Sequence, residues 1–347
     1  TRTSEYLEQV RNNAKFWLLG LFITAIALLA TLFGFTLLIN RRVLVRLGAL
    51  ERASQSITEG DLSARSHVLG KDELGKLGVT FDGMVARLTE MLAIVKEANA
   101  RMEEELNVGR DIQMSMLPLT FPPFPDRKEF SIYAELHPAR EVGGDFYDFF
   151  FLDEHHLCFC VGDVSGKGVP AALFMAVTRT LLRAIATAEL SAAEIITRVN
   201  NKLSSDNPTN MFVTVFLGVL DVRTGICQYS SGGHPPPLHS SKGQAKFVEK
   251  IQGPALGIIE NSDYAEATLV LGAGEYLLAY TDGVTEAESA SGEFQGEERL
   301  RKVLQKNVSN NVKSLTELVV KSTAAFEEGT DQSDDVTVLA LRFERTT

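Results

Sequence analysis

The sequence predicts an α+β protein in which a globular domain follows a membrane-spanning helix and a series of amphipathic helices. Three observations support this class. One long uncharged apolar segment lies near the start, heptad-spaced apolar residues follow it, and short apolar runs then alternate with helical segments. The chain has 347 residues, of which 45% are hydrophobic, so we expect more than one domain and a large core.

Charge and cysteine content exclude several kinds of protein. The formal net charge is −11, so we expect no nucleic-acid partner bound through its phosphates. Cys158, Cys160 and Cys227 form neither a zinc-ligand pattern nor a disulfide framework, which favours a reducing, cytosolic setting. Because the sequence starts at Thr1, we interpret residues 1–15 as the end of a sensor region that continues upstream.

Residues 16–39 carry no charge and match the roughly 20 apolar residues that cross a bilayer. Trp17 lies at one edge, where aromatic residues favour the membrane interface. Basic residues flank both edges: Arg11 and Lys15 before the segment, and Arg41, Arg42 and Arg46 after it. The run is too long for a signal peptide, and a buried core helix is the alternative. We expect a transmembrane helix in the inner membrane, with the globular domain cytoplasmic.

Residues 40–92 contain two amphipathic segments joined by a connector. In the second segment apolar residues recur at spacings of three and four: Leu74, Leu77, Phe81, Met84, Leu88 and Met91. Asp72 and Glu73 open this segment, as acidic residues do at a helix N-terminus. The arrangement resembles a HAMP domain, although Val43 and Val45 stand where a proline is common. A plain coiled coil is the alternative, and either arrangement predicts a homodimer.

The heptad pattern continues through residues 93–117, which we interpret as a coiled-coil linker. Four prolines then prevent the helix from continuing: Pro118, Pro122, Pro123 and Pro125. We therefore place the globular domain at residues 118–347. We also expect the linker's end, near residues 113–117, to pack on the helices of that domain.

The globular domain shows strand-like segments separated by pairs of helical segments, which predicts a two-sheet α+β core. The predicted strands are 131–136, 145–152, 157–161, 212–220, 225–230, 267–271, 275–280 and 336–343. The predicted helices are 169–188, 191–204, 297–308 and 314–327.

Four aspartates stand at the ends of these predicted strands, each in a glycine-rich or acidic motif. They are Asp145 in G-G-D-F-Y-D, Asp163 in G-D-V-S-G-K-G, Asp282 in T-D-G-V-T-E and Asp334 in S-D-D-V-T-V. Hard divalent cations require several converging carboxylate oxygens, and paired cations hydrolyse phosphate esters. Taken singly, each aspartate could instead form a turn or cap a helix.

As an ordered set, these motifs resemble the metal-dependent protein phosphatases of the stage II sporulation protein E type, a branch of the protein phosphatase 2C (PPM) superfamily. The resemblance covers about residues 110–343 and includes R-D-I-Q-M-S-M-L-P and G-G-H-P-P-P. It implies a PPM-type α-β-β-α sandwich with two Mn²⁺ or Mg²⁺ ions in a cleft at one edge of the sheets. It also implies a phosphoserine or phosphothreonine protein phosphatase.

The resemblance assigns roles to the aspartates. Asp163 would bridge the two ions, helped by the backbone carbonyl of Val164. Asp282 and Asp334 would hold one ion, and Asp145 would lie near the pair and serve a third, weaker ion. The neighbouring residue, Asp335, could exchange roles with Asp334, and we favour Asp334.

Two further residues are candidates for substrate binding and proton transfer. Arg140 precedes Asp145 where the superfamily can place a phosphate-binding arginine, and an ordinary surface arginine is the alternative. Ser165 stands where eukaryotic relatives commonly have a histidine, so the general acid is open. His234 and metal-bound water are both candidates, and a structural role for His234 in its glycine- and proline-rich turn is the favoured alternative.

The resulting hypothesis is a membrane-anchored phosphatase in bacterial signalling, acting on a phosphorylated anti-sigma-factor antagonist and controlled through HAMP and linker helices. One alternative is a HAMP-linked receptor or scaffold whose phosphatase fold binds partners without catalysis. A histidine kinase is a weaker alternative, because His67 lies in the connector and no glycine-rich nucleotide site follows.

Overall fold

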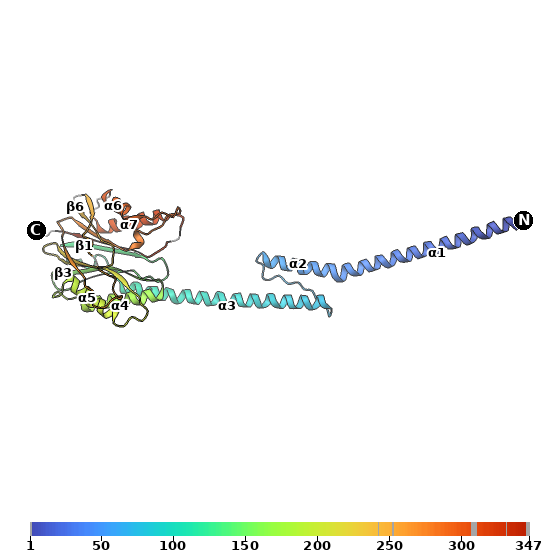
Figure 1. Ribbon diagram of the computed structural model, residues 1–347, viewed down its shortest axis with the longest axis horizontal. Helices are drawn as coiled ribbons and strands as arrows, with labels where there is room; N and C mark the ends of the chain where they lie inside the picture. The colour runs from blue at the N-terminus through green and yellow to red at the C-terminus, as the bar shows by residue number, and fades with distance from the viewer. Residues whose placement is uncertain (1, 242, 252, 307–310, 331, 345–347) are drawn as a thin grey trace. The chain divides into compact units, whose positions relative to one another are not determined.

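The computed structural model describes residues 2–241, 243–251, 253–306, 311–330 and 332–344 (Figure 1). The chain divides into two compact units, Thr1–Arg101 and Met102–Thr347. We describe each unit by itself.

The first unit begins with one long helical segment. It comprises α1 (Arg2–Ile39), a π-helical turn η1 (Asn40–Leu44) and α2 (Val45–Thr58). This segment holds a stretch long and apolar enough to cross a membrane, with a mean hydropathy of 2.4, and none of that stretch is buried. A buried core helix, the alternative for residues 16–39, therefore does not describe this segment.

The connector after α2 packs against the N-terminal part of α3 (Glu73–Met116). A Cβ atom on Gly75 would lie 2.3 Å from the carbonyl oxygen of Gly70, so the close approach requires glycine. The backbone N–H of Ser66 donates to Asp82 at 2.7 Å, and Arg46 forms an ion pair with Asp72. Gly75 and Asp82 of α3 thus hold the connector in place.

The second unit contains two five-stranded sheets in which every neighbouring pair is antiparallel. The first sheet has the order β1 (Phe130–His137), β10 (Val336–Phe343), β9 (Tyr276–Tyr280), β6 (Leu238–Ser241) and β7 (Gln244–Phe247). The second has the order β2 (Phe146–Phe151), β3 (His156–Val164), β4 (Val213–Asp221), β5 (Ile226–Gly232) and β8 (Glu266–Val270).

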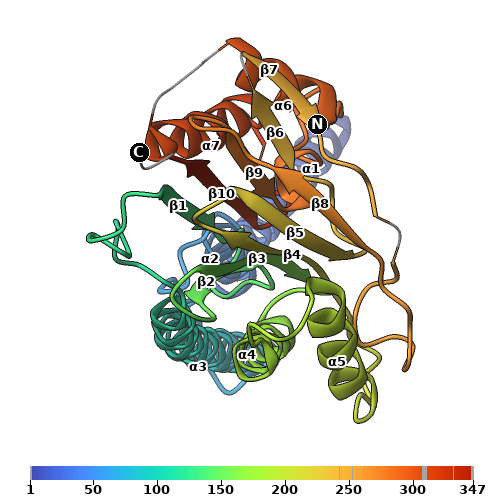
Figure 2. The same ribbon diagram turned by 90° about the vertical axis from the view of Figure 1, so that its left-hand side faces the viewer.

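Helices cover the outer faces of both sheets, as Figure 2 shows. The first sheet packs against α6 (Gly296–Lys306) and α7 (Val312–Phe326), and the second against α4 (Val169–Ile185) and α5 (Ala192–Ser204). This arrangement confirms the predicted α-β-β-α sandwich. The prediction for 297–308 ends on two residues, 307 and 308, that lie outside the described part of the chain.

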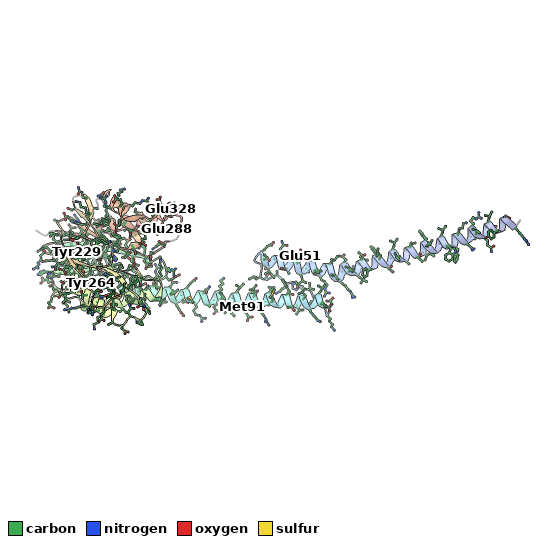
Figure 3. All side chains as sticks on the ribbon, in the orientation of Figure 1. Glu51, Met91, Tyr229, Tyr264, Glu288 and Glu328 are labelled. Atoms are coloured by element: carbon green, nitrogen blue, oxygen red, sulfur yellow. The ribbon has the colours of Figure 1, made fainter. Side chains whose placement is uncertain are left out.

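The main core lies between the two sheets and includes Phe146, Phe159 and Phe216, each at most 1% exposed. Tyr229 and Tyr264, labelled in Figure 3, are also buried in it. Burial of these large apolar side chains is the main force that holds the sheets together.

A buried ion pair fastens α4 to the second sheet. Asp148 on β2, 1% exposed, accepts from Arg183 at 2.5 and 2.7 Å and lies 3.0 Å from Arg179. A buried carboxylate is tolerated because both guanidinium groups compensate its charge. This contact fixes the helix that directly follows the G-D-V-S-G-K-G loop.

Candidate metal centre

The four predicted aspartates come from both sheets. Asp145 directly precedes β2 and Asp163 lies near the end of β3, both in the second sheet. Asp282 begins the short turn η2 (Asp282–Val284) after β9, and Asp334 lies just before β10, both in the first sheet.

Their electrostatic environment shows that these carboxylates lie near one another. The pKa of Asp163 is raised to about 7, first by burial and then by the negative charges of Asp282 and Asp334. Burial also raises the pKa of Asp282, and the charges of Glu286 and Asp334 add to that effect. Clustered carboxylates whose charged forms are disfavoured are suited to binding a cation.

Asp145 is 2% exposed and is held by two hydroxyl groups. Its Oδ2 atom accepts hydrogen bonds from Thr281 and Thr337, each at 2.6 Å. Burial, followed by the charges of Asp163 and Asp335, raises its pKa well above the ordinary value. Threonines at the adjoining ends of β9 and β10 therefore orient a carboxylate that belongs to the other sheet.

Asp335 points toward the loop before β2. Its carboxylate accepts from the backbone N–H groups of Ala139 and Gly144 at 2.8 Å and of Asp145 at 3.4 Å. A Cβ atom on Gly143 would lie 2.1 Å from Asp335 Oδ2, so a side chain would block this contact. Asp335 thus organises the G-G-D loop, while its neighbour Asp334 remains available to the carboxylate cluster.

The donor groups fit hard divalent cations by their chemistry. They are carboxylate oxygens with one backbone carbonyl, that of Val164, and such a set suits Mg²⁺ or Mn²⁺. A Cβ atom on Gly144 would lie 2.7 Å from the Val164 oxygen, so glycine leaves that carbonyl accessible. Among the described residues, no three His, Cys, Asp or Glu side chains already form a chelating group. Charge and donor type therefore fit the cations, without a preformed cage.

Two polar residues that the sequence did not single out contact this region. Lys167 lies 3.2 Å from Asp334 Oδ2 and donates to the carbonyl oxygen of Ser333 at 2.6 Å. The sequence signal that could have identified Lys167 is its place as the basic residue of the G-D-V-S-G-K-G motif.

The second is Gln113, 7% exposed, on the last turns of α3. Its amide donates to the carbonyl oxygen of Gly143 at 2.7 Å and accepts from the Gly143 N–H at 3.2 Å. Leu117, 4% exposed, is part of the main core. The end of α3 therefore packs on the main core and on the loop that precedes Asp145, whereas the sequence predicted packing on the helices of the domain.

The remaining candidates differ in their surroundings. Arg140 is exposed on the loop between β1 and β2 and has no hydrogen bond or ion pair with any described residue. His234 is buried, and its Nδ1 accepts from the Thr214 hydroxyl at 2.9 Å while Nε2 donates to the Tyr280 carbonyl at 3.0 Å. Burial lowers its pKa to about 4. A neutral ring with both nitrogens engaged supports the structural interpretation.

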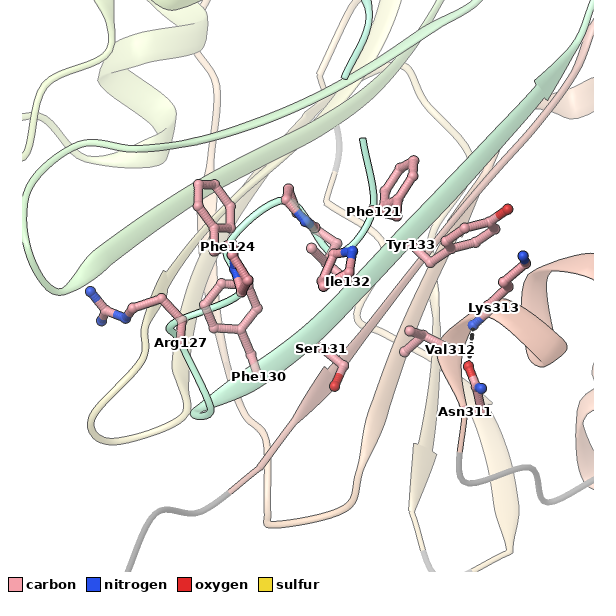
Figure 4. Close-up of a pocket in the computed structure, with 13 residues that line it drawn as sticks. Phe121, Phe124, Arg127, Phe130, Ser131, Ile132, Tyr133, Asn311, Val312 and Lys313 are labelled. Atoms are coloured by element: carbon pink, nitrogen blue, oxygen red, sulfur yellow. Dashed lines mark hydrogen bonds between the residues drawn. The ribbon is translucent and has the colours of Figure 1, made fainter. Parts of the chain in front are cut away.

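Two cavities of the globular unit differ in their distance from the carboxylates. One, of about 490 Å³, is lined by Asp282, His234, Lys250 and Glu286 among others, and therefore adjoins the carboxylates. The other, of about 370 Å³, is lined by Phe121, Phe124, Tyr133 and Lys313 among others (Figure 4). This second cavity reaches the end of β1 where Phe130 pairs with Phe343. Asp335 lies at the opposite end of β1, next to Val336, which pairs with His137. The second cavity is thus away from the candidate centre.

Comparison with known proteins gives two matching family models. The model for stage II sporulation protein E matches residues 153–344, and the HAMP domain model matches residues 38–90. Protein IcfG of Synechocystis is 34% identical over 323 residues, which cover 84% of this chain and 50% of that protein. The chain therefore spans about half the length of this relative.

Two other proteins are similar over most of the globular unit. Phosphoserine phosphatase RsbU of Bacillus subtilis is 24% identical over 242 residues, which cover 70% of each protein. The solved SiaA-PP2C domain of Pseudomonas aeruginosa superposes with a TM-score of 0.63 at 22% identity, covering 71% of this chain and 99% of that one. This superposition supports the fold.

Proposed function

Since the chain belongs to the stage II sporulation protein E family and contains a HAMP domain, we propose that it is a membrane-anchored, metal-dependent protein phosphatase acting on phosphoserine or phosphothreonine. The observation that carries the proposal is the convergence of carboxylates from both sheets on Asp163. The named phosphoserine phosphatase among the relatives supports the same reaction.

In this proposal Asp163, the Val164 carbonyl, Asp282 and Asp334 would hold two Mn²⁺ or Mg²⁺ ions, with Asp282 and Asp334 holding the same ion. When bound, such ions activate water as a nucleophile and neutralise the phosphate. Asp145, held by two threonine hydroxyls, would keep its carboxylate in one orientation beside them or serve a third ion.

Substrate binding would use groups around the carboxylates. The exposed guanidinium of Arg140 has no described partner to compete with a phosphate, and its planar fork can contact two phosphate oxygens. The cavity beside Asp282 has room for residues next to a phosphoserine. His234 is not a proton donor in this proposal, because both of its ring nitrogens are engaged.

We further propose that the substrate is a phosphorylated anti-sigma-factor antagonist and that the protein is a homodimer at the inner membrane, with the phosphatase domain in the cytoplasm. The exposed apolar residues of α3, such as Met91, Val95 and Met102, support pairing of two α3 helices. The contact between Gln113 and Gly143 supports control of the centre through α3.

The test uses the full chain in detergent with p-nitrophenyl phosphate and a phosphoserine protein as substrates. We expect hydrolysis that requires Mn²⁺ or Mg²⁺ and is lost in Asp163→Asn. The matched control is Asp206→Asn, which makes the same change at an exposed aspartate and should remain active. Metal-independent activity, or full activity in Asp163→Asn, would contradict the proposal. A folded protein without activity would favour a partner-binding role.

A further inference from the structure

Lys167 brings a positive charge into the candidate metal centre. Its ammonium group lies 3.2 Å from Asp334 Oδ2 and donates to the carbonyl oxygen of Ser333 at 2.6 Å. Lys167 belongs to the loop that follows Asp163 in the second sheet, whereas Asp334 precedes β10 of the first sheet. The lysine thus connects two loops that each carry a proposed metal ligand.

Both loops have other contacts that hold them in place. Ser165 exchanges hydrogen bonds with Phe212: its N–H donates to the Phe212 carbonyl at 2.8 Å, and its hydroxyl accepts from the Phe212 N–H at 2.9 Å. On the other loop, the amide of Gln332 donates to the carbonyl oxygens of Asp334 at 2.7 Å and of His137 at 2.9 Å. The loops therefore do not depend on Lys167, and its distinctive contribution is charge.

The side chain of Lys167 is free to move away from Asp334. It is 40% exposed, and the carboxylate of Asp334 is 44% exposed. An ion pair with this much exposure to water is weak and exchanges readily, because solvent screens it. A divalent cation that binds the Asp334 carboxylate competes with the ammonium group for the same oxygens.

We propose that Lys167 is a positioning residue that serves as an internal counter-cation for Asp334. It neutralises the carboxylate when the divalent cation is absent and competes with that cation when it binds. The inference rests on the proposed role of Asp334 as a metal ligand. It adds that Lys167 sets the affinity with which Asp334 binds the cation. The lysine makes occupancy of this position depend on the concentration of metal.

The test measures Mn²⁺ binding to the full chain in detergent at neutral pH, with free Mn²⁺ quantified by electron paramagnetic resonance. Lys167→Met removes the charge and keeps most of the aliphatic chain, and we expect the Mn²⁺ held by Asp334 to bind about three- to tenfold more tightly. Lys167→Arg keeps the charge and should bind like the wild type. Lys202→Met, at an exposed lysine on α5, controls for the change in net charge.

Thermal unfolding without metal is a second readout. Lys167→Met should unfold at a lower temperature than the wild type or Lys167→Arg, because Asp334 loses its counter-charge, and saturating Mn²⁺ should remove the difference. Equal or weaker Mn²⁺ binding by Lys167→Met overturns the inference about Lys167. If Mn²⁺ binding is instead the same in the wild type and in Asp163→Asn, the proposed metal centre itself is wrong.

Discussion

Replacing the two threonines that hold Asp145 tests the geometry of the centre directly. Valine has nearly the same shape as threonine, so Thr281→Val and Thr337→Val delete hydroxyl groups without opening a cavity. Both threonines are fully buried, and water cannot replace the lost hydrogen bonds to Asp145. The two variants remove different numbers of contacts, which allows an ordered prediction.

The expected magnitudes follow from those contacts. The Thr281 hydroxyl donates to Asp145 at 2.6 Å and also accepts from the N–H of Thr337 at 3.0 Å. Its loss removes two hydrogen bonds and leaves a buried N–H unpaired, which costs about 3 kcal/mol. The Thr337 hydroxyl donates only to Asp145 among the described contacts, so Thr337→Val should cost about 1.5 kcal/mol.

A matched control is available on α7. Thr316 is also fully buried, but its hydroxyl donates to the carbonyl of Val312 in the preceding turn of the same helix. Thr316→Val should cost about 1 kcal/mol or less and leave Mn²⁺ binding unchanged. Urea unfolding without metal, followed by far-UV circular dichroism, gives the free energies. The tryptophan Trp17 lies in α1, so its fluorescence does not report on this unit.

The reasoning also requires an effect on metal. A carboxylate that can rotate is a poorer neighbour for the cations, so both site variants should bind Mn²⁺ more weakly than Thr316→Val. If Thr281→Val is no less stable than Thr316→Val, the hydroxyl contacts to Asp145 do not contribute as described. If all three variants bind Mn²⁺ equally well, the orientation of Asp145 has no part in the centre.

Three other predictions concern the neighbouring contacts. Asp335→Asn should lower the free energy of unfolding by about 2–3 kcal/mol, because the Asp335 carboxylate accepts from three backbone N–H groups. Asp334→Asn should change stability little and weaken Mn²⁺ binding. Urea unfolding and Mn²⁺ titration distinguish the two variants. Gln113→Leu leaves the backbone of Gly143 without its partners, so hydrogen exchange in residues 139–146 should be about tenfold faster or more, and unchanged exchange would contradict this contact. The folded-state pKa of His234 is about 4 against 6.5 for an unperturbed histidine, so the unfolded state takes up the proton first. Above pH 6.5 the neutral ring makes its full contribution to the free energy of unfolding. That contribution, about 3 kcal/mol, is lost as the pH falls toward 4. The free energy of unfolding of His234→Gln should lack this part of the pH dependence.

Much of the fold could be predicted because several of its strands are strongly apolar. β3, β9 and β10 are buried along nearly their whole length, so each appears in the sequence as an apolar run. The strands β6 and β7 escaped prediction because each has only four residues, with the sequences LHSS and QAKF. Such segments carry no recognisable period, and β6 is a strand because it pairs with β9.

The carboxylates of the site could be identified because each lies in a short motif after or before an apolar strand. Their supporting residues could not be identified, because a hydroxyl or amide acquires its role only from three-dimensional proximity. Thr281 and Asp145 are 136 positions apart, and Gln113 and Gly143 are 30 apart. The adjacent Asp334 and Asp335 look equivalent in sequence. In the structure Asp335 is buried and bonds to the G-G-D loop, whereas Asp334 is partly exposed and pairs with Lys167.

The G-G-D loop lies between the end of α3 and the proposed metal ligands. Both backbone polar groups of Gly143 bond to Gln113, and the next N–H, that of Gly144, bonds to Asp335. A shift of the last turns of α3 must therefore either break the bonds to Gly143 or move this loop, because the other side is held by Asp335. Asp145 is the next residue in the loop, so its carboxylate would be displaced first. In the proposed control through α3, a signal would act on the position of Asp145 before it affects Asp163 or Asp282.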